Sequence, residues 1–193
     1  MRRRRQRSRR WLRLLVVLLA GFGAAIVAAR LDPLPPPLAG TARAGDGDSL
    51  TLSGERVRLL GIDAPELDQT CGRADGQLWT CGAAARNRLA VLVAAGPTSC
   101  IRNGSDRYGR ILATCSTAGN DLGAMMVAEG LALSSSGYPA EEAAARAAGR
   151  GIWAGRFVAP RQWRDEAEDA VSPSLAELVW TWFRELTGAR SLR

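Results

Sequence analysis

The sequence contains no histidine and no lysine. Without histidine, the chain lacks a serine–histidine triad, a histidine-ligated zinc site and an imidazole general base. All 26 basic residues are therefore arginine, whose planar guanidinium keeps its charge and donates paired hydrogen bonds to phosphate. These absences direct attention to the carboxylates and arginines, and to the places where they cluster.

The net charge of +7 lies at the N-terminus. Residues 1–30 hold nine arginines and no acidic residue, whereas residues 31–193 hold 17 arginines and 19 acidic residues. The larger part of the chain is thus slightly acidic. Any polyanion binding by this part must depend on a local basic patch rather than on net charge.

The first thirty residues have the layout of an export signal. An arginine-rich head, Met1–Arg13, precedes the uncharged stretch Leu14–Ala29, whose last small residues, Val27–Ala29, suit cleavage. Cleavage would release the domain, whereas retention as a signal anchor would tether it to the inner membrane with the arginines in the cytoplasm. A twin-arginine route is a further alternative, and the apolar run disfavours a DNA-binding arm. We expect a periplasmic or extracellular protein.

The rest of the chain is expected to form one compact domain with appendages. Residues 31–45 are predicted to be a proline-rich linker without strands, residues 46–164 the domain, and residues 165–193 a helical tail. Strands followed by helices indicate an α+β domain. The predicted strands are Ser49–Leu52, Arg56–Ile62, Thr98–Arg102 and Arg110–Ser116, and the predicted helices are Cys81–Ala95, one through Leu122 and Val127 to a stop at Gly130, and Glu141–Ala148 after Pro139.

The tail is predicted to begin with an acidic hinge, Asp165–Asp169, before a last helix that opens at Ser172–Ser174. Packing on its own domain is the favoured use of the apolar stripe on this helix. The alternative is a membrane interface, with Trp180 and Trp182 as anchors. The stripe consists of Leu175, Leu178, Val179, Trp182, Phe183 and Leu186.

Four cysteines in an exported chain favour two disulfides over free thiols. Cys100 and Cys115 flank the predicted hairpin, and antiparallel pairing centred between residues 107 and 108 brings them face to face. This leaves Cys71 to pair with Cys81 across a polar loop of nine residues. Free structural thiols are the alternative, and the spacings match no zinc site.

Two clusters of charged residues carry the chemistry. The second is Asp106–Arg110, and the first contains Asp46, Asp48, Arg58, Asp63 and Glu66. Strand alternation is expected to bring the first cluster together at one end of a small sheet. Carboxylates that hold a hard divalent cation, beside arginines that neutralise a phosphoryl transition state, are what metal-assisted phosphodiester hydrolysis needs. Taken singly, each fragment is better interpreted as an ordinary turn or a surface ion pair, and only the combination indicates this chemistry.

From about Ala44 to Trp163, the chain resembles the thermonuclease family, the staphylococcal-nuclease-like domain. The resemblance rests on Asp46–Ser49, Arg58–Glu66, Asp106–Arg110 and Gly151–Trp153, in this order and spacing. The insert Cys71–Cys81 is similar to that of an exported bacterial subgroup. The resemblance implies an OB-type five-stranded β-barrel with three packed helices.

The resemblance also implies a calcium site. Asp48, Asp63 and the backbone carbonyl of Ala64 match calcium ligands, and Asp46 matches a carboxylate in the outer shell of the metal. Family members often have threonine at the position of Ala64, but the ligand there is a carbonyl, so we expect little loss of metal binding.

The remaining implied roles concern the substrate. Arg58 and Arg110 match the guanidinium groups that hold the scissile phosphate, and Glu66 matches the general base. Arg107, Tyr108 and Tyr138 match substrate contacts, whereas Ser136 lies where another ring is expected. The implied function is calcium-dependent hydrolysis of DNA and RNA by a monomeric endonuclease. The alternative is a non-catalytic oligonucleotide- or protein-binding module at the cell envelope.

Overall fold

The computed structural model describes residues 14–23, 25, 36–171, 179–180 and 182–183 of the chain. Residues 14–23 are helical. Of the helices formed by the described residues, none combines the length and the apolar character that crossing a membrane requires. The predicted cleavage site, Val27–Ala29, lies outside the described residues, and so does most of the predicted last helix.

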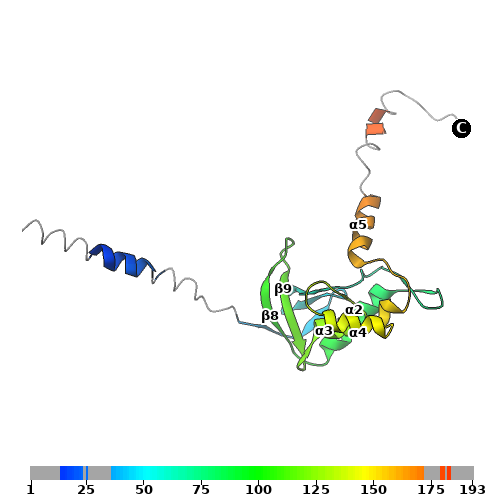
Figure 1. Cartoon of the computed structure of the whole chain (residues 1–193), viewed down its shortest axis with the longest axis horizontal. Coiled ribbons are helices and arrows are strands. Elements are labelled where there is room, and N and C mark those ends of the chain that lie inside the picture. The colour runs from blue at the N-terminus through cyan, green and yellow to red at the C-terminus, as the bar shows by residue number, and fades with distance from the viewer. Residues whose placement is uncertain (1–13, 24, 26–35, 172–178, 181, 184–193) are drawn as a thin grey trace, which may run out of the picture. The chain divides into compact units, whose positions relative to one another are not determined.

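The domain is built on one mixed sheet, with helices packed beside it (Figure 1). Its strands follow the order β1-β8-β9-β4-β3-β2, and β10 pairs with β9. The β4–β9 pair is parallel and the other pairs are antiparallel. The strands are β1 (Leu38–Gly40), β2 (Ala42–Ala44), β3 (Ser49–Leu52), β4 (Glu55–Leu59), β8 (Thr98–Ser105), β9 (Ile111–Thr117) and β10 (Asn120–Asp121).

The prediction of a strand-free linker is wrong for the stretch that forms β1 and β2. β1 pairs with β8, and β2 pairs with β3. Each strand has only three residues, too few for the alternation of a strand to be recognised against a preceding run of prolines. β1 and β2 lie at the two ends of the strand order and do not pair with each other. The predicted closed five-stranded barrel is therefore not confirmed, whereas the predicted mixed α+β fold is confirmed.

The predicted strand Arg56–Ile62 is interrupted by a turn. β4 ends at Leu59, and Gly61 has a φ of +83°, a conformation that favours glycine. The chain then forms β5 (Ile62–Asp63), which pairs with β11 (Leu133–Ser134) in a separate two-stranded sheet. The turn directs Asp63 away from the main sheet.

The three predicted helices are present: α2 (Cys81–Ala94), α3 (Leu122–Ala128) and α4 (Pro139–Ala147). α2 and α3 pack on the main sheet, and α4 packs on α3. Asp121 caps α3 by accepting a hydrogen bond from the amide of Ala124 at 3.0 Å. A 3₁₀ turn, η1 (Gly151–Ala154), follows α4. The core between sheet and helices includes Leu50, Leu52, Val57, Leu59, Leu89, Leu122 and Met126, all at most 2% exposed.

The acidic hinge predicted at Asp165–Asp169 is wrong, because these residues belong to α5 (Pro160–Val171). Proline suits the first turn of a helix, where its missing N–H is not needed. Gln162 donates to Glu166 at 2.8 Å, one helical turn further on. The acidic residues therefore lie on a helix rather than in an extended hinge.

Both predicted disulfides are present. Cys100 and Cys115 are direct partners in the β8–β9 pairing, with Cα atoms 4.1 Å apart, and the predicted register holds until a bulge between Arg102 and Gly104. Cys71 and Cys81 are also bonded, at a Cα distance of 5.7 Å. Their bond closes the small hairpin of β6 (Cys71–Gly72) and β7 (Leu78–Trp79) beside the fully buried Ile152.

Candidate functional site

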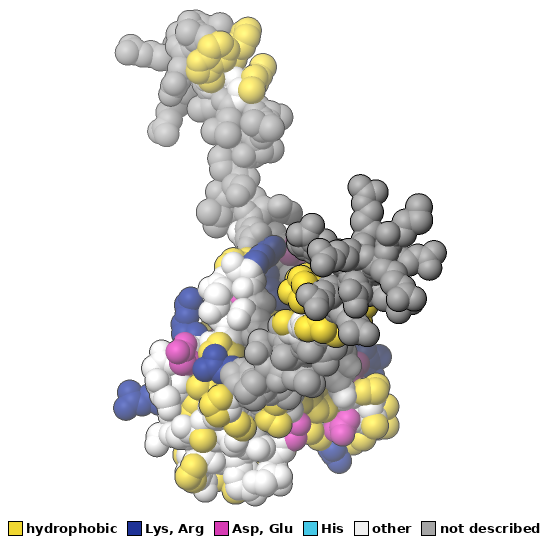
Figure 2. Space-filling model, turned by 90° about the vertical axis from the view of Figure 1, so that its left-hand side faces the viewer, with side chains coloured by type: hydrophobic (Ala, Val, Ile, Leu, Met, Phe, Trp, Pro, Cys, Tyr) yellow, Lys and Arg dark blue, Asp and Glu magenta, His cyan; other side chains and the backbone are white. Residues whose placement is uncertain are grey.

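A pocket of about 950 Å³ is lined by residues of β4, the tip of the β8–β9 hairpin and the first turns of α5. Most of its lining is charged: Arg56, Arg58, Arg107, Arg110, Arg161 and Arg164, with Asp46, Glu66, Asp106 and Asp165. Figure 2 shows one face of the molecule, on which blue and magenta side chains are interspersed with yellow ones. The pocket is thus a local site with more cations than anions, as polyanion binding requires.

Arg58 links two carboxylates at one end of the pocket. Its Nη1 donates to Oδ1 of Asp48 at 2.9 Å, and its Nη2 lies 2.6 Å from Oδ2 of Asp48 and 3.1 Å from Oδ1 of Asp63. The β3–β4 pairing sets Ser49 opposite Arg58, so the residue before β3 lies beside the guanidinium. Asp48 and Asp63 therefore converge on one cationic nitrogen, as the strand alternation predicted.

Asp48 is the buried member of this cluster, with 3% of its surface exposed. Burial raises its pKa to about 7, although the charge of Arg58 acts in the opposite direction. The amide of Ala64 also donates to Oδ2 of Asp48, at 3.3 Å. A carboxylate held in such a place needs a cation or a proton to balance its charge.

Asp46 shapes the turn before β3. Its Oδ1 accepts hydrogen bonds from the amides of Asp48 at 3.0 Å and Ser49 at 2.7 Å. Burial acts to raise the pKa of Asp46, but hydrogen bonds from Ser49 and Asp48 bring it below its ordinary value. Asp46 thus sits behind Asp48 and fixes the backbone that carries it.

Arg164 on α5 contacts the carboxylates of Glu66 and Asp63, and this arginine was not predicted from the sequence. Its Nη1 donates to Oε1 of Glu66 at 2.6 Å, and its Nη2 lies 3.1 Å from Oδ1 of Asp63. With α5 recognised as a helix, the spacing of Arg161 and Arg164 would have placed both on one face. Asp63 is consequently shared between Arg58 and Arg164.

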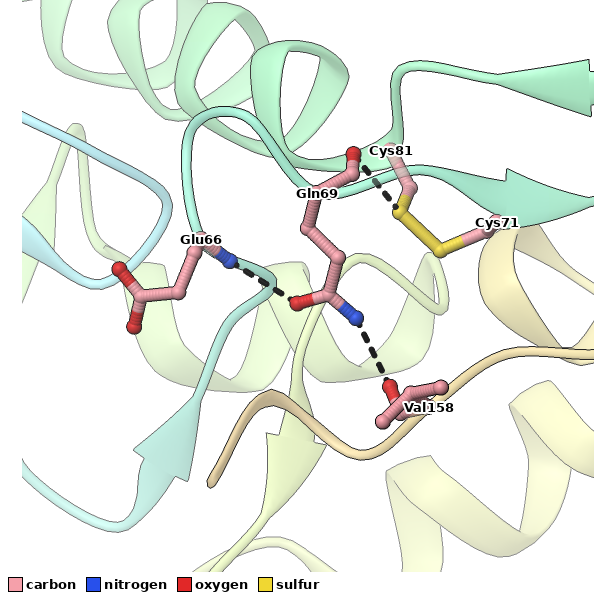
Figure 3. Close-up of a disulfide and its surroundings, with 5 residues drawn as sticks. All are labelled: Glu66, Gln69, Cys71, Cys81 and Val158. Carbon is pink, nitrogen blue, oxygen red and sulfur yellow. Dashed lines mark hydrogen bonds between the residues drawn. A yellow bond between two sulfur atoms is a disulfide. The ribbon is translucent and has the colours of Figure 1, made fainter. Parts of the chain in front are cut away.

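A buried glutamine connects Glu66 to the segment before α5 (Figure 3). Gln69 is fully buried; its Oε1 accepts from the amide of Glu66 at 3.1 Å, and its Nε2 donates to the carbonyl of Val158 at 2.8 Å. The Sγ of Cys81 lies 3.4 Å from the carbonyl oxygen of Gln69, so this glutamine also touches the disulfide. Sequence reasoning missed Gln69 too, because both side-chain partners are backbone groups.

The hairpin tip, Asp106–Arg110, forms the opposite side of the pocket. Asp106 accepts from the amides of Tyr108 and Arg110, both at 2.9 Å, and from Nε of Arg110 at 2.7 Å. Among the described residues, no hydrogen-bond or ion-pair partner contacts the terminal nitrogens of Arg110. The guanidinium groups of Arg107 and Arg110 lie 4.8 and 5.7 Å from the ring centre of Tyr108. This side presents cations and an exposed ring to the pocket.

Tyr138 does not line the pocket. Its hydroxyl donates to Oδ1 of Asp121 at 3.0 Å, and burial, reinforced by Asp121, raises its pKa to about 12. Its ring fits against Gly123, where a β-carbon would lie 2.7 Å from the hydroxyl oxygen. Its role in substrate binding stays a prediction.

The donor set at Asp48 and Asp63 fits a hard divalent cation in kind. Two carboxylates converge on one cationic nitrogen, and oxygen donors are what calcium accepts. In the part of the chain that the structure describes, no group of three histidine, cysteine or acidic residues is arranged to hold a metal ion. Arg58 and Arg164 occupy the carboxylates instead, so an ion would have to share Asp63 with them or replace them.

Comparisons with known proteins agree with this geometry. A family model described as staphylococcal nuclease homologue matches residues 56–155. The succinoglycan biosynthesis protein ExoI of Rhizobium meliloti (strain 1021) is 37% identical over 124 residues, which are 61% of this chain and 65% of that protein. The chain therefore spans slightly less than two thirds of the length of this relative.

Proposed function

Since the chain belongs to the staphylococcal nuclease homologue family, we propose that it is a calcium-dependent nuclease that hydrolyses phosphodiester bonds in DNA and RNA. The single observation that carries this proposal is the pocket that Arg58, Glu66 and Arg110 line together. Two guanidinium groups and a carboxylate facing one space are the groups that a phosphodiester and an attacking water need.

Arg58 and Arg110 bind the scissile phosphate in this proposal. Among the described residues, none binds the terminal nitrogens of Arg110, so both nitrogens are available to two phosphate oxygens. Arg58 approaches from the β4 side, held in place by Asp48. As the phosphorus becomes five-coordinate, charge grows on its equatorial oxygens, and two fixed cations stabilise that state more than the ground state.

Glu66 orients the attacking water and accepts its proton, directly or through a second water. A bond forms between the water oxygen and phosphorus, the phosphorus–oxygen ester bond breaks, and the leaving alkoxide takes up a proton from solvent water, to which Glu66 later returns the proton it accepted. Asp48, Asp63 and the carbonyl of Ala64 would hold calcium, which supplies charge screening and fixes the relative orientation of phosphate and water.

Export of a monomer completes the proposal. Two disulfides are consistent with an oxidising compartment. The arginine-rich head and the apolar stretch after it support delivery to the periplasm or the exterior, cleaved or anchored.

A non-catalytic binding module is the second candidate. In its favour, ion pairs engage Asp48, Asp63 and Glu66, which leaves none of these carboxylates without a cation. The relative named for succinoglycan biosynthesis is a further reason to test binding apart from cleavage.

The deciding experiment is a cleavage assay on labelled single-stranded DNA and RNA, with calcium or with a chelator. We expect cleavage with calcium, none with chelator, and a loss of about a hundredfold or more in Glu66→Gln. Tight binding without cleavage in the presence of calcium would favour the second candidate. Cleavage that persists with chelator, or in Glu66→Gln, would refute the proposed mechanism.

A further inference from the structure

Arg164 spans two carboxylates with a single planar group. One terminal nitrogen binds Oε1 of Glu66, and the other lies 3.1 and 3.3 Å from the two carboxylate oxygens of Asp63. A guanidinium has a rigid fork, so contacts with both nitrogens fix the spacing and the orientation of the two carboxylates relative to each other.

The position of Arg164 is itself determined by the loop that carries Glu66. The side chain of Gln69 binds the backbone of Glu66 at one end and the carbonyl of Val158 at the other (Figure 3). The amide of Gly72 adds a second tie, to the carbonyl of Arg156 at 2.7 Å. From Val158 the chain enters α5 at Pro160, and Arg164 reaches back to the Glu66 side chain. The backbone of Glu66 is thus linked through Gln69 to Val158, and its side chain is linked to Arg164 six residues further on.

From these contacts we propose that Arg164 is a positioning residue of the site, which holds the carboxylates of Glu66 and Asp63 in the arrangement that hydrolysis requires. The inference rests on the proposed function, and it adds α5 to the machinery of the site. It assigns to residues beyond the matched range 56–155 a part in the reaction.

Two other roles for Arg164 give different results. If Arg164 bound a substrate phosphate other than the scissile one, its removal would lower substrate affinity without slowing bound substrate. If Arg164 only docked α5, its removal would lower thermal stability. Lysine at this position would then serve nearly as well, since a single ion pair would be enough. Substitution of a positioning residue instead lowers the rate constant for bound substrate. Such a residue must also have the planar guanidinium, because lysine cannot bind both carboxylates in a fixed orientation.

The test compares Arg164→Gln and Arg164→Lys with the wild-type full chain on a single-stranded DNA oligonucleotide in calcium. We expect kcat to fall about tenfold to a hundredfold in Arg164→Gln, with KM changed by less than about threefold, because misplaced groups slow a bound substrate. Arg164→Lys should recover only part of the loss. Arg86→Ala, which removes an exposed arginine of α2, is the matched control and should behave as wild type.

A second measurement does not depend on activity. Thermal unfolding of Glu66→Gln, Arg164→Gln and the double variant, without metal, forms a double-mutant cycle. The proposal requires the shift in Tm of the double variant to be smaller than the two single shifts together. Additive shifts, a rise in KM at unchanged kcat, or full recovery by lysine would overturn it. An inert wild-type protein with a non-additive cycle would refute the proposed nuclease activity while leaving the contact established.

Discussion

The two sides of the pocket hold their charged groups in different ways. On the β4–β5 side, Arg58 binds carboxylates five and ten positions away in the sequence, and one of them, Asp48, is 3% exposed. On the hairpin side, Asp106 binds backbone groups two and four positions away, and Tyr108 is 59% exposed. Substitutions on the first side should therefore change both the cleavage rate and the free energy of unfolding. On the second side, a substitution should be able to change the rate with little effect on stability.

Arg58→Ala should have the largest effect, because it acts on both properties. It removes a phosphate donor, which we expect to lower the rate by about a hundredfold or more. It also leaves Asp48 buried without its cation, which should reduce the free energy of unfolding by about 3 kcal/mol. Chemical denaturation and the cleavage assay measure the two effects. Asp48→Asn added to Arg58→Ala should restore part of the stability and none of the activity; stability close to wild type in Arg58→Ala would contradict the coupling.

Arg110→Ala should reach a similar loss of rate with little change in stability. Its ion pair with Asp106 is partly exposed and joins residues four apart in one turn, so we expect it to contribute little to stability. We expect about a hundredfold slower cleavage and a denaturation midpoint close to that of the wild type. Arg107→Ala is the comparison within the same turn, and it should affect substrate affinity more than rate. A large loss of stability in Arg110→Ala would remove the contrast between the two sides.

Each side also has its own disulfide, and removing them one at a time sharpens the contrast. Replacing either pair by alanine should lower the free energy of unfolding by about 3 kcal/mol, because the two loops are similar in length. The variant without Cys71 and Cys81 should also lose activity, by about tenfold, since the loop of Gln69 and Glu66 is loosened. The variant without Cys100 and Cys115 should keep its activity at temperatures where it is folded. Equal losses of activity in the two variants would contradict this.

The same contrast explains what could be predicted from the sequence. Local patterns indicated the β8–β9 register and the Cys100–Cys115 bond, because each depends on residues close together in the chain. Strand alternation and motif resemblance both indicated the convergence of Asp48 and Asp63. Arg164 was missed because it lies 98 and 101 positions from its partners, directly before the segment Asp165–Asp169 that was interpreted as a hinge.

Backbone partners were a second source of error. Gln69 binds an amide and a carbonyl, and no sequence pattern marks the residues that supply them. The strands β1 and β2 are short, and their identity as strands comes from pairing with β8 and β3 rather than from their own composition. Long-range pairing of this kind is decided by the whole fold.

The smallest expected effect is a local loosening of the hairpin tip in acid. Burial acts to raise the pKa of Asp106, but hydrogen bonds from Arg110 and Tyr108 bring it below its ordinary value. A carboxylate whose pKa is lower in the folded state stabilises the fold above its unfolded pKa, and this contribution is lost as the pH falls through the folded pKa. The amide signals of Tyr108 and Arg110 should therefore shift at a pH below 3.8, the ordinary value.

These signals should move without global unfolding, since the tip is held by local contacts, and Asp106→Asn should abolish the transition. The amide of Ala64, which donates to Asp48 on the other side, is the internal comparison. Because burial raises the pKa of Asp48 to about 7, the signal of Ala64 should respond near neutral pH instead. One titration followed by nuclear magnetic resonance thus reports both sides, and a single common midpoint would show that the two sides do not titrate independently.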